Sequence, residues 1–380
     1  MKFKTIDDFN FSGKRVLVRV DLNSEVSDGK IQMSDRISES AKTIAELCKK
    51  GARVVVLAHQ GRLGDEDFTS LEQHAKLLNK IVKIKFVDDV IGEKALSEIS
   101  SLKDGQAILL ENVRGLKEES DGGAENNLVR TLAGHFYLYV NDAFSVSHRE
   151  QTSITGFPKV LPSCIGRTME QELNALGHLD KMKNALFILG GSKTDNVLLM
   201  KKKKVITCGV YGHLCLVAKG NDLGAQNKFL EKTVKDYSAV LADLKKVVLG
   251  VRTPMDLAVN ANGRRKELAI SEFPSEYEVF DIGSRTISLY KDLIKNSEAV
   301  FMKGTAGYCE DAKFCFGTRE LLNAIASSKC FSVLSGGHTS TALKKFGIPK
   351  KKFDYVSLSG GALVWYLVGK KLPGLEALRK

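Results

Sequence analysis

The chain has 380 residues, which is long for one hydrophobic core and suits two domains of ordinary size. With 43% hydrophobic and 27% charged residues, it has the composition of a soluble globular protein. No apolar run is long enough to span a bilayer or to form a signal-peptide core. The net charge of +12 leaves nucleic acid or a small polyanionic substrate open as partners.

Apolar strand-like runs alternate with amphipathic helical stretches in the first part of the chain, as in parallel α/β sheets. The expected strands are residues 15–20, 53–58, 85–87, 107–110 and 136–140, and the expected helices are residues 38–50, 71–82, 93–101 and 126–133. Residues 151–167 contain Gly156, Pro158, Pro162 and Gly166, which predicts a loop or hinge, and a helix over 169–181 follows.

The same alternation returns in the second part. The expected strands are residues 185–189, 204–207, 246–249, 256–259, 279–282, 299–302, 331–334 and 355–357. The expected helices are residues 214–219, 227–244, 284–295, 318–328, 339–346 and 362–368. The prediction is an α/β fold of two doubly wound, Rossmann-like parallel-sheet lobes. Its parts are a first domain (1–165 with the tail 369–380), a hinge and interdomain helix (166–182), and a second domain (183–368).

The seven cysteines are an odd number and contain no Cys-x-x-Cys pair. Reduced thiols in a cytosolic protein, with no zinc site, are the simplest interpretation. The run Lys201–Lys204 is interpreted as solvated surface rather than as a binding patch.

Polar residues follow the expected strands of the first half, where ligands bind in open α/β sheets. Asp21 and Asn23 follow the first strand and His59 follows the second. Four arginines, here called the arginine rim, lie in these loops or shortly after them: Arg36, Arg62, Arg114 and Arg149. His148 lies beside the last of them. Converging guanidinium groups predict a ligand with more than one anionic group, and Asp21 and Asn23 could accept from a substrate hydroxyl.

At the midpoint, the expected strand 185–189 ends at Gly190-Gly191, and Lys193 follows. A glycine pair lets the backbone approach a ligand, its amides can cup an anion, and lysine adds a charge for phosphate. A short Gly-Gly-x-Lys is also compatible with an ordinary surface turn, and the Walker spacing is absent.

These residues, in this order, resemble the phosphoglycerate kinase family nearly end to end. The resemblance runs through Arg15–Asn23, His59–Arg62, Glu111–Arg114, Asn141–Phe144 and His148-Arg149 in the first half. In the second half it continues through Gly190–Lys193, Asp281–Gly283 with Thr286, Gly304–Glu310, Gly336–Thr339, Ser357–Ala362 and Leu372–Gly374. The short second lobe and the form of the His59 loop look like archaeal members.

The resemblance implies a phosphotransferase of glycolysis and gluconeogenesis with a carboxyl group as acceptor. It would move the acyl phosphate of 1,3-bisphosphoglycerate to Mg-ADP, reversibly, in line and after hinge closure, in the cytoplasm. It implies phosphoglycerate binding by Asp21, Asn23, Arg36, His59, Arg62, Arg114 and Arg149, with Arg36 and Lys193 on the transferred group. The implied nucleotide-binding residues are Gly190, Gly191, Lys193, Gly209, Gly304, Glu310, Gly336, Gly337, His338 and Thr339. No nucleic acid or membrane partner is expected, and a monomer is expected, with a dimer as the alternative.

Three departures from the family lie in the second half. Val197 stands where the family has a second lysine, and Lys201 or Lys202 could replace it. His338 stands where a family aspartate helps to hold magnesium, and Asp195 or water could take its place. Lys303-Gly-Thr305 replaces the family's Asn-Gly-Pro. The alternatives are therefore a paralogue that binds phosphoglycerate with weak or lost nucleotide-dependent activity, and a nucleic-acid binder favoured only by the net charge.

Overall fold

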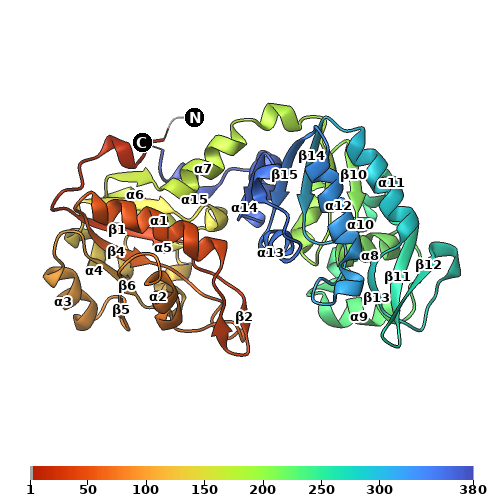
Figure 1. The fold of residues 1–380 in the computed structure, drawn as a ribbon. Coiled ribbons are helices and arrows are strands. Elements are labelled where there is room, and N and C mark those ends of the chain that lie inside the picture. Colours follow the sequence, from red (N-terminus) through yellow and green to blue (C-terminus); the bar gives the residue numbers. More distant parts are fainter. Residues whose placement is uncertain (1–2, 380) are drawn as a thin grey trace. The chain divides into compact units, whose positions relative to one another are not determined.

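The computed structural model describes residues 3–379, which form two compact units. The first unit runs to Leu176 and also takes in the segment from Lys370 onward, and the second comprises Gly177–Gly369. Figure 1 shows both units with their labelled elements. No helix within the described residues is both long and apolar enough to cross a membrane.

The first unit is built on a six-stranded, fully parallel sheet with the order β5-β6-β4-β1-β7-β8. The strands are β1 (Arg15–Val20), β4 (Arg53–Leu57), β5 (Lys85–Val87), β6 (Ala107–Leu110), β7 (Leu138–Asp142) and β8 (Ser163–Ile165). A small hairpin, β2 (Val26–Ser27) and β3 (Lys30–Ile31), lies outside this sheet. The carboxyl ends of all six strands share one edge.

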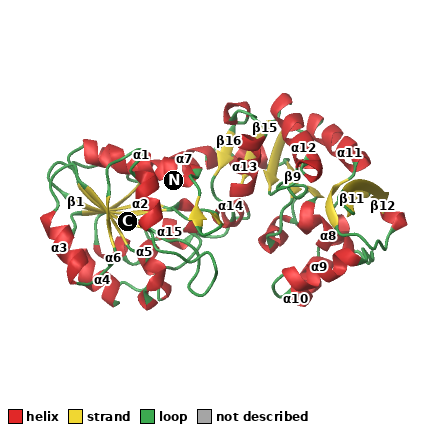
Figure 2. Ribbon diagram, turned by 60° about the horizontal axis from the view of Figure 1, so that its bottom comes forward, coloured by secondary structure: helices red, strands yellow, loops and turns green. Residues whose placement is uncertain are grey.

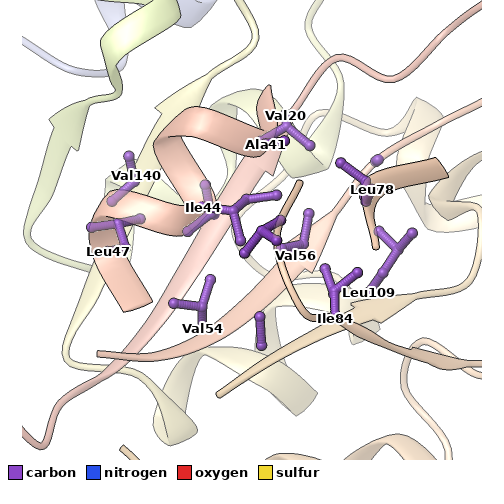
Figure 3. Packing of buried hydrophobic residues seen from close by; sticks show 14 of the residues in the cluster. Val20, Ala41, Ile44, Leu47, Val54, Val56, Leu78, Ile84, Leu109 and Val140 are labelled. Carbon is purple, nitrogen blue, oxygen red and sulfur yellow. The ribbon is translucent and has the colours of Figure 1, made fainter. Parts of the chain in front are cut away.

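Helices cover both faces of this sheet (Figure 2). The helices of this unit are α1 (Asp35–Lys49), α2 (Glu72–Leu78), α3 (Glu93–Ser101), α4 (Asn127–Leu132), α5 (Thr152–Thr155), α6 (Phe157–Val160), α7 (Arg167–Leu176) and α15 (Pro373–Glu376). Along β4, Val54 and Val56 enter one core, whereas Val55 and Leu57 enter the other. Figure 3 shows Ile44 of α1 close to Val56 in the first of these cores. Burial on both faces explains the continuous apolar runs of these strands.

The second unit has a five-stranded parallel sheet with the order β10-β9-β14-β15-β16. The strands are β9 (Leu186–Leu189), β10 (Lys204–Thr207), β14 (Ala299–Lys303), β15 (Phe331–Ser335) and β16 (Tyr355–Ser357). The helices are α8 (Gly209–Ala218), α9 (Ala225–Thr233), α10 (Tyr237–Lys245), α11 (Ser284–Lys295), α12 (Phe316–Ser327), α13 (Gly337–Lys345) and α14 (Gly361–Leu367). The predicted α/β class with two parallel sheets is therefore confirmed.

A second sheet of this unit is antiparallel, with the order β12-β11-β13. Its strands are β11 (Asp256–Ala261), β12 (Arg264–Ala269) and β13 (Val279–Ile282). Strands β11 and β13 were predicted from the sequence, but β12 was not. Its first four residues, 264–267, are all charged, so the strand shows no alternation of polar and apolar residues. This sheet and the parallel one pack into one continuous core.

Three element predictions are wrong. Residues 151–167 are not a loop, because they form α5, α6 and the edge strand β8. Residues 246–249 are not a strand. They follow α10 and enter a 3-10 helix, η8 (Val248–Gly250), in which only Val248 is buried and Leu249 is 87% exposed. The helix expected over 227–244 is two helices, because the chain turns extended at Val234 and left-handed at Asp236.

Candidate active site

The loops that carry the arginine rim are joined by hydrogen bonds at the carboxyl edge of the first sheet. The side chain of Asn23, after β1, accepts a hydrogen bond from the Gly61 amide, after β4, at 2.8 Å. The Arg114 guanidinium, in η2 (Val113–Gly115) after β6, donates to the Gly61 carbonyl. The loops after β1, β4 and β6 are therefore held in one arrangement.

Arg36, near the start of α1, faces the same edge. Its Nη1 donates to the Asn23 carbonyl at 2.8 Å and lies 3.3 Å from Asp21 Oδ2. Asp21 also accepts from the Ser145 hydroxyl and, at 3.0 Å, from the Asn23 amide. Both predicted hydroxyl acceptors, Asp21 and Asn23, are thus engaged by the protein itself, and their contact with substrate stays a prediction.

The other two members of the rim show no such engagement. Arg62 is exposed, and it makes no side-chain hydrogen bond or ion pair within residues 3–379. Arg149 is half-buried beside His148, and burial and the charge of Arg62 lower its pKa. These two guanidinium groups are close enough to repel each other, so a bound anion would stabilise both.

His59 is fully buried among the positive charges of this edge. Burial, followed by the charges of Arg19, Arg114, Arg36 and Arg149, holds its pKa well below the usual 6.5. The imidazole is therefore neutral at physiological pH. The predicted residues Arg36, His59, Arg62, Arg114 and Arg149 act on one another electrostatically, as expected of a single cluster.

Arg19 is a member of this cluster that the sequence analysis did not select. It lies in β1, is fully buried, and donates to Ser153 Oγ at 2.7 Å. Its Nη2 lies 3.0 Å from His59 Nδ1, and Glu119 lies 4.0 Å away. The available signal was a charged residue inside an otherwise apolar strand, since such a residue is buried only with partners.

In the second unit, the turns after β9, β10 and β14 pack backbone to backbone. A Cβ on Gly190 would lie 2.5 Å from the Thr305 carbonyl oxygen, and one on Gly304 would lie 2.5 Å from Gly190. Gly209, which begins α8, meets the same Thr305 oxygen and has a φ of +57°. Side chains are thus excluded at all three turns by close packing.

This packing corrects one expectation about the glycine pair. The Gly190 amide donates to the Lys303 carbonyl at 2.7 Å, and the Gly191 amide donates to the Thr305 carbonyl at 2.9 Å. Both amides are therefore used within the protein, and the idea that they cup an anion is wrong. Phosphate binding near this turn would depend on side-chain cations instead.

Two lysines lie at this turn or next to it. Lys193 is exposed, and Lys303, the last residue of β14, is buried with its Nζ 2.6 Å from Asp195 Oδ1. Burial lowers the pKa of Lys303, Asp195 opposes that shift, and Lys193 adds to it. Lys202 is engaged elsewhere, because it donates to the Leu367 carbonyl at 2.9 Å. In the sequence, Lys303 stands out only as a departure from the family pattern.

The predicted residues Gly336 to Thr339 form the start of α13. Gly336 precedes the helix with a φ of +100°, and Gly337 and His338 are exposed in the first turn. Thr339 is buried and donates its hydroxyl to the Ser335 carbonyl at 3.1 Å. Since the first amides of a helix have no carbonyl acceptor within it, this turn is suited to a phosphate.

Glu310 lies in an exposed loop that is closed by a disulfide between Cys309 and Cys315. The Tyr308 hydroxyl donates to Glu310, and Lys345 donates to the Cys309 carbonyl. The expectation that all cysteines are reduced is wrong for this pair, because the two residues are six apart in sequence and the loop brings their Cα atoms to 4.3 Å.

Magnesium would have few protein ligands here. No group of three or more His, Cys, Asp or Glu side chains in the described part of the chain could hold a metal. Asp195, two residues after Lys193, is half-buried, and only its Oδ1 is bonded to Lys303. One carboxylate with phosphate oxygens and water suffices for Mg²⁺, so these residues fit an ion that arrives with the nucleotide.

A two-unit α/β fold with cationic groups at the carboxyl edge of each parallel sheet is typical of the class of enzymes that act on small anions. The family model for phosphoglycerate kinase matches residues 6–370. The chain belongs to the phosphoglycerate kinase family, and the resemblance seen in the sequence is confirmed.

Relatives match over nearly the whole chain. The phosphoglycerate kinase of Methanopyrus kandleri is 40% identical over 98% of this chain and 97% of its own length. The phosphoglycerate kinase of Methanothermus fervidus is 39% identical over 100% of this chain and 97% of its own length. The crystal structure of phosphoglycerate kinase from Pyrococcus horikoshii OT3 has a TM-score of 0.90 and 33% identity, and covers 99% of this chain and 98% of its own.

The activity of the chain is therefore that of a phosphoglycerate kinase, a glycolytic enzyme. It transfers a phosphoryl group reversibly between 1,3-bisphosphoglycerate and ADP, giving 3-phosphoglycerate and ATP.

Proposed function

We propose that the arginine rim, with Asp21, Asn23 and His59, binds 3-phosphoglycerate and 1,3-bisphosphoglycerate. The observation that carries this assignment is an excess of positive charge at one sheet edge. Four guanidinium groups act on His59, and the two carboxylates that face them, Asp21 and Glu119, are already paired with Arg36 and Arg19. A ligand with a carboxylate and a phosphate supplies the missing negative charge, and Arg can bind each group bidentately.

The second unit binds the nucleotide at the turns that carry Gly190, Gly191, Gly209 and Gly304, and at the start of α13. The glycines let the backbone segments meet, and Lys193 and the first amides of α13 face the phosphates. Glu310, in its exposed loop, contacts the ribose. Asp195 takes part in holding the magnesium ion, which neutralises phosphate charge when the nucleotide is bound.

Arg36 and Lys193 act on the transferred phosphoryl group. In the ATP-consuming direction the nucleophile is a carboxylate, which is ionised at neutral pH, so the reaction needs no general base. The neutral state of His59 agrees with a binding role rather than an acid–base role. The chain's contribution is placement of the reactants and positive charge on the oxygens of the transferred group.

A coupled assay with 3-phosphoglycerate and Mg-ATP tests these two residues. R36M and K193M should each lower kcat by about 100-fold, because each removes one charge from the transferred group. K295M, which changes an exposed lysine at the end of α11 in the same unit, is the control and should match the wild type. Near-normal turnover in R36M or K193M would show that the residue is wrongly assigned.

The hinge closure expected from the sequence, the cytoplasmic location and the two domain boundaries remain predictions. The assignment of the substrates to separate units requires that the bound substrates be brought together for transfer, away from water that would hydrolyse an acyl phosphate.

A further inference from the structure

Lys303 is a buried cation at the centre of the second parallel sheet. It ends β14, the middle strand, opposite Leu189 of β9 and Ser335 of β15. These two neighbours lead directly into the Gly190 and Gly336 turns. The residue is only 4% exposed. A buried lysine is costly unless its charge is used, so this position requires an explanation.

The contacts of Lys303 connect it to the turn that carries Lys193. Its Nζ donates to Asp195 Oδ1 at 2.6 Å and to Asn196 Oδ1 at 2.8 Å. Asn196 in turn donates from Nδ2 to the Gly190 carbonyl at 3.1 Å. An ammonium group has three N–H donors, so one donor of Lys303 has no acceptor within residues 3–379.

The charges at this turn do not balance. Lys193 and Lys303 are close enough to act on each other, and Asp195 is the carboxylate that pairs with Lys303. Two positive charges and one negative charge leave a surplus of one. A phosphate oxygen would neutralise that surplus and could accept the remaining N–H of Lys303.

The sequence departures described above meet at this place. Val197, where the family has a lysine, is half-buried in η7 (Thr194–Leu199) and directly follows Asn196. Lys303 stands where the family has asparagine, and its Nζ contacts Asn196. The positive charge that is missing from position 197 is therefore supplied to the same turn from the neighbouring strand.

We propose that Lys303 is a second phosphate-binding lysine, which together with Lys193 binds the phosphoryl group of the nucleotide. This inference rests on the proposed assignment of the nucleotide to these turns. The competing explanation is that Lys303 only neutralises Asp195 and has no contact with substrate. The two explanations differ in what happens when Asp195 is also made neutral.

The experiment is a double-mutant cycle of K303M and D195N, assayed with 3-phosphoglycerate and Mg-ATP. Because Asp195 is itself proposed to hold magnesium, all four variants are assayed at saturating Mg²⁺. A phosphate-binding lysine then predicts that K303M lowers kcat about 100-fold both in the wild type and in the D195N background. Calorimetry should show an unchanged Kd for 3-phosphoglycerate, because that ligand is assigned to the other unit. If K303M costs turnover in the wild type but nothing in D195N, Lys303 is only the partner of Asp195 and the proposal is overturned.

Moving the positive charge from position 303 back to position 197 provides a second and independent test. K303N should lose turnover, and V197K/K303N, which restores the family arrangement, should regain most of it. K295M is the matched control, because it removes an exposed lysine at the end of α11 in the same unit. If thermal melting shows that K303M does not fold, the comparison of K303N with V197K/K303N tests the proposal instead. If K303N is soluble and adding V197K does not restore its turnover, the proposal is overturned.

The proposed function fails in a different way. If the nucleotide does not bind at these turns, K193M as well as K303M would leave kcat and the Kd for ADP unchanged. A wrong assignment of Lys303 alone leaves the effect of K193M intact.

Discussion

At the first sheet edge, His59 is an example of a side chain whose charge state is set by its neighbours. Arg19 Nη2 lies 3.0 Å from its Nδ1, and a guanidinium can only donate, so Nδ1 accepts and Nε2 carries the proton. Burial and the nearby arginine charges lower its pKa far below 6.5. In the unfolded chain, the same histidine has its ordinary pKa near 6.5. The unfolded state therefore binds more protons than the folded state at acidic pH.

The pH dependence of stability follows from that difference. Below about pH 6.5 the unfolded state gains a proton at His59 that the folded state does not, which lowers the unfolding free energy by about 1.4 kcal/mol per pH unit. H59Q should remove that part of the slope in urea denaturation between pH 6.5 and 5. His74 and His213, with pKa values lowered by burial to about 4 and about 3, contribute slope of the same sign. Asp142 and Asp281, whose pKa values burial raises to about 6, contribute slope of the opposite sign, and none of these four groups is changed in H59Q.

The same variant measured at pH 8 is the control, since there both states of His59 are neutral and only its packing is lost. An H59Q slope equal to that of the wild type would contradict the neutral, buried state of this histidine.

Single residues also show where sequence reasoning stops. Arg36, Arg62, Arg114 and Arg149 were predictable because each follows shortly after a strand that could be read from its apolar run. Arg19 and Lys303 were not selected because both lie within strands, where a charge is usually an exception to burial rather than a ligand. The role of Arg19 depends on its contact with His59, which is 40 positions away in the sequence. The role of Lys303 depends on its contact with Asp195, which is 108 positions away.

At the scale of elements, the Glu310 loop is held by covalent and polar links. The Cys309–Cys315 disulfide closes it, and Lys345 of α13 donates to the Cys309 carbonyl. The loop thereby keeps a fixed relation to the helix whose first turn is assigned to phosphate.

Removal of the disulfide should lower stability. In a chain-entropy account, closing so short a loop stabilises the folded state by about 2 kcal/mol. C315S should lose about that amount in denaturant melts without reductant, and the wild type with reductant should fall to a similar level. C48S, at a half-buried free cysteine, is the control and should respond to reductant as the wild type does. A wild type that is equally stable with and without reductant would contradict this prediction.

The elements predicted correctly are those with a strong local signal. Strands such as β1 and β6 are short apolar runs between turn residues, and their pairing in parallel follows from the helices between them. Residues 246–249 look the same locally, but they follow α10 and enter the 3-10 helix η8. Hydrophobic periodicity cannot separate such a segment from a strand in so short a run. Residues 151–167 contain glycine and proline yet form helices and an edge strand, because tertiary packing outweighed their local preference.

At the scale of the whole molecule, the two kinds of charge cluster lie in different units of the chain. The arginine rim belongs to the unit that ends at Leu176, and Lys193 and Lys303 belong to the unit that begins at Gly177. The family match spans both, which agrees with a reaction that needs two anionic substrates. The net charge of +12 agrees with small polyanionic substrates, one of the two kinds of partner that the composition left open.

If each unit binds its own substrate, calorimetry of R62M and K193M with both 3-phosphoglycerate and ADP should separate the two units. Both side chains are exposed, so neither change should disturb folding. R62M should weaken 3-phosphoglycerate binding by at least about 10-fold and leave ADP binding unchanged, whereas K193M should do the reverse. If R62M leaves 3-phosphoglycerate binding unchanged, or if either variant weakens both ligands equally, the account is contradicted.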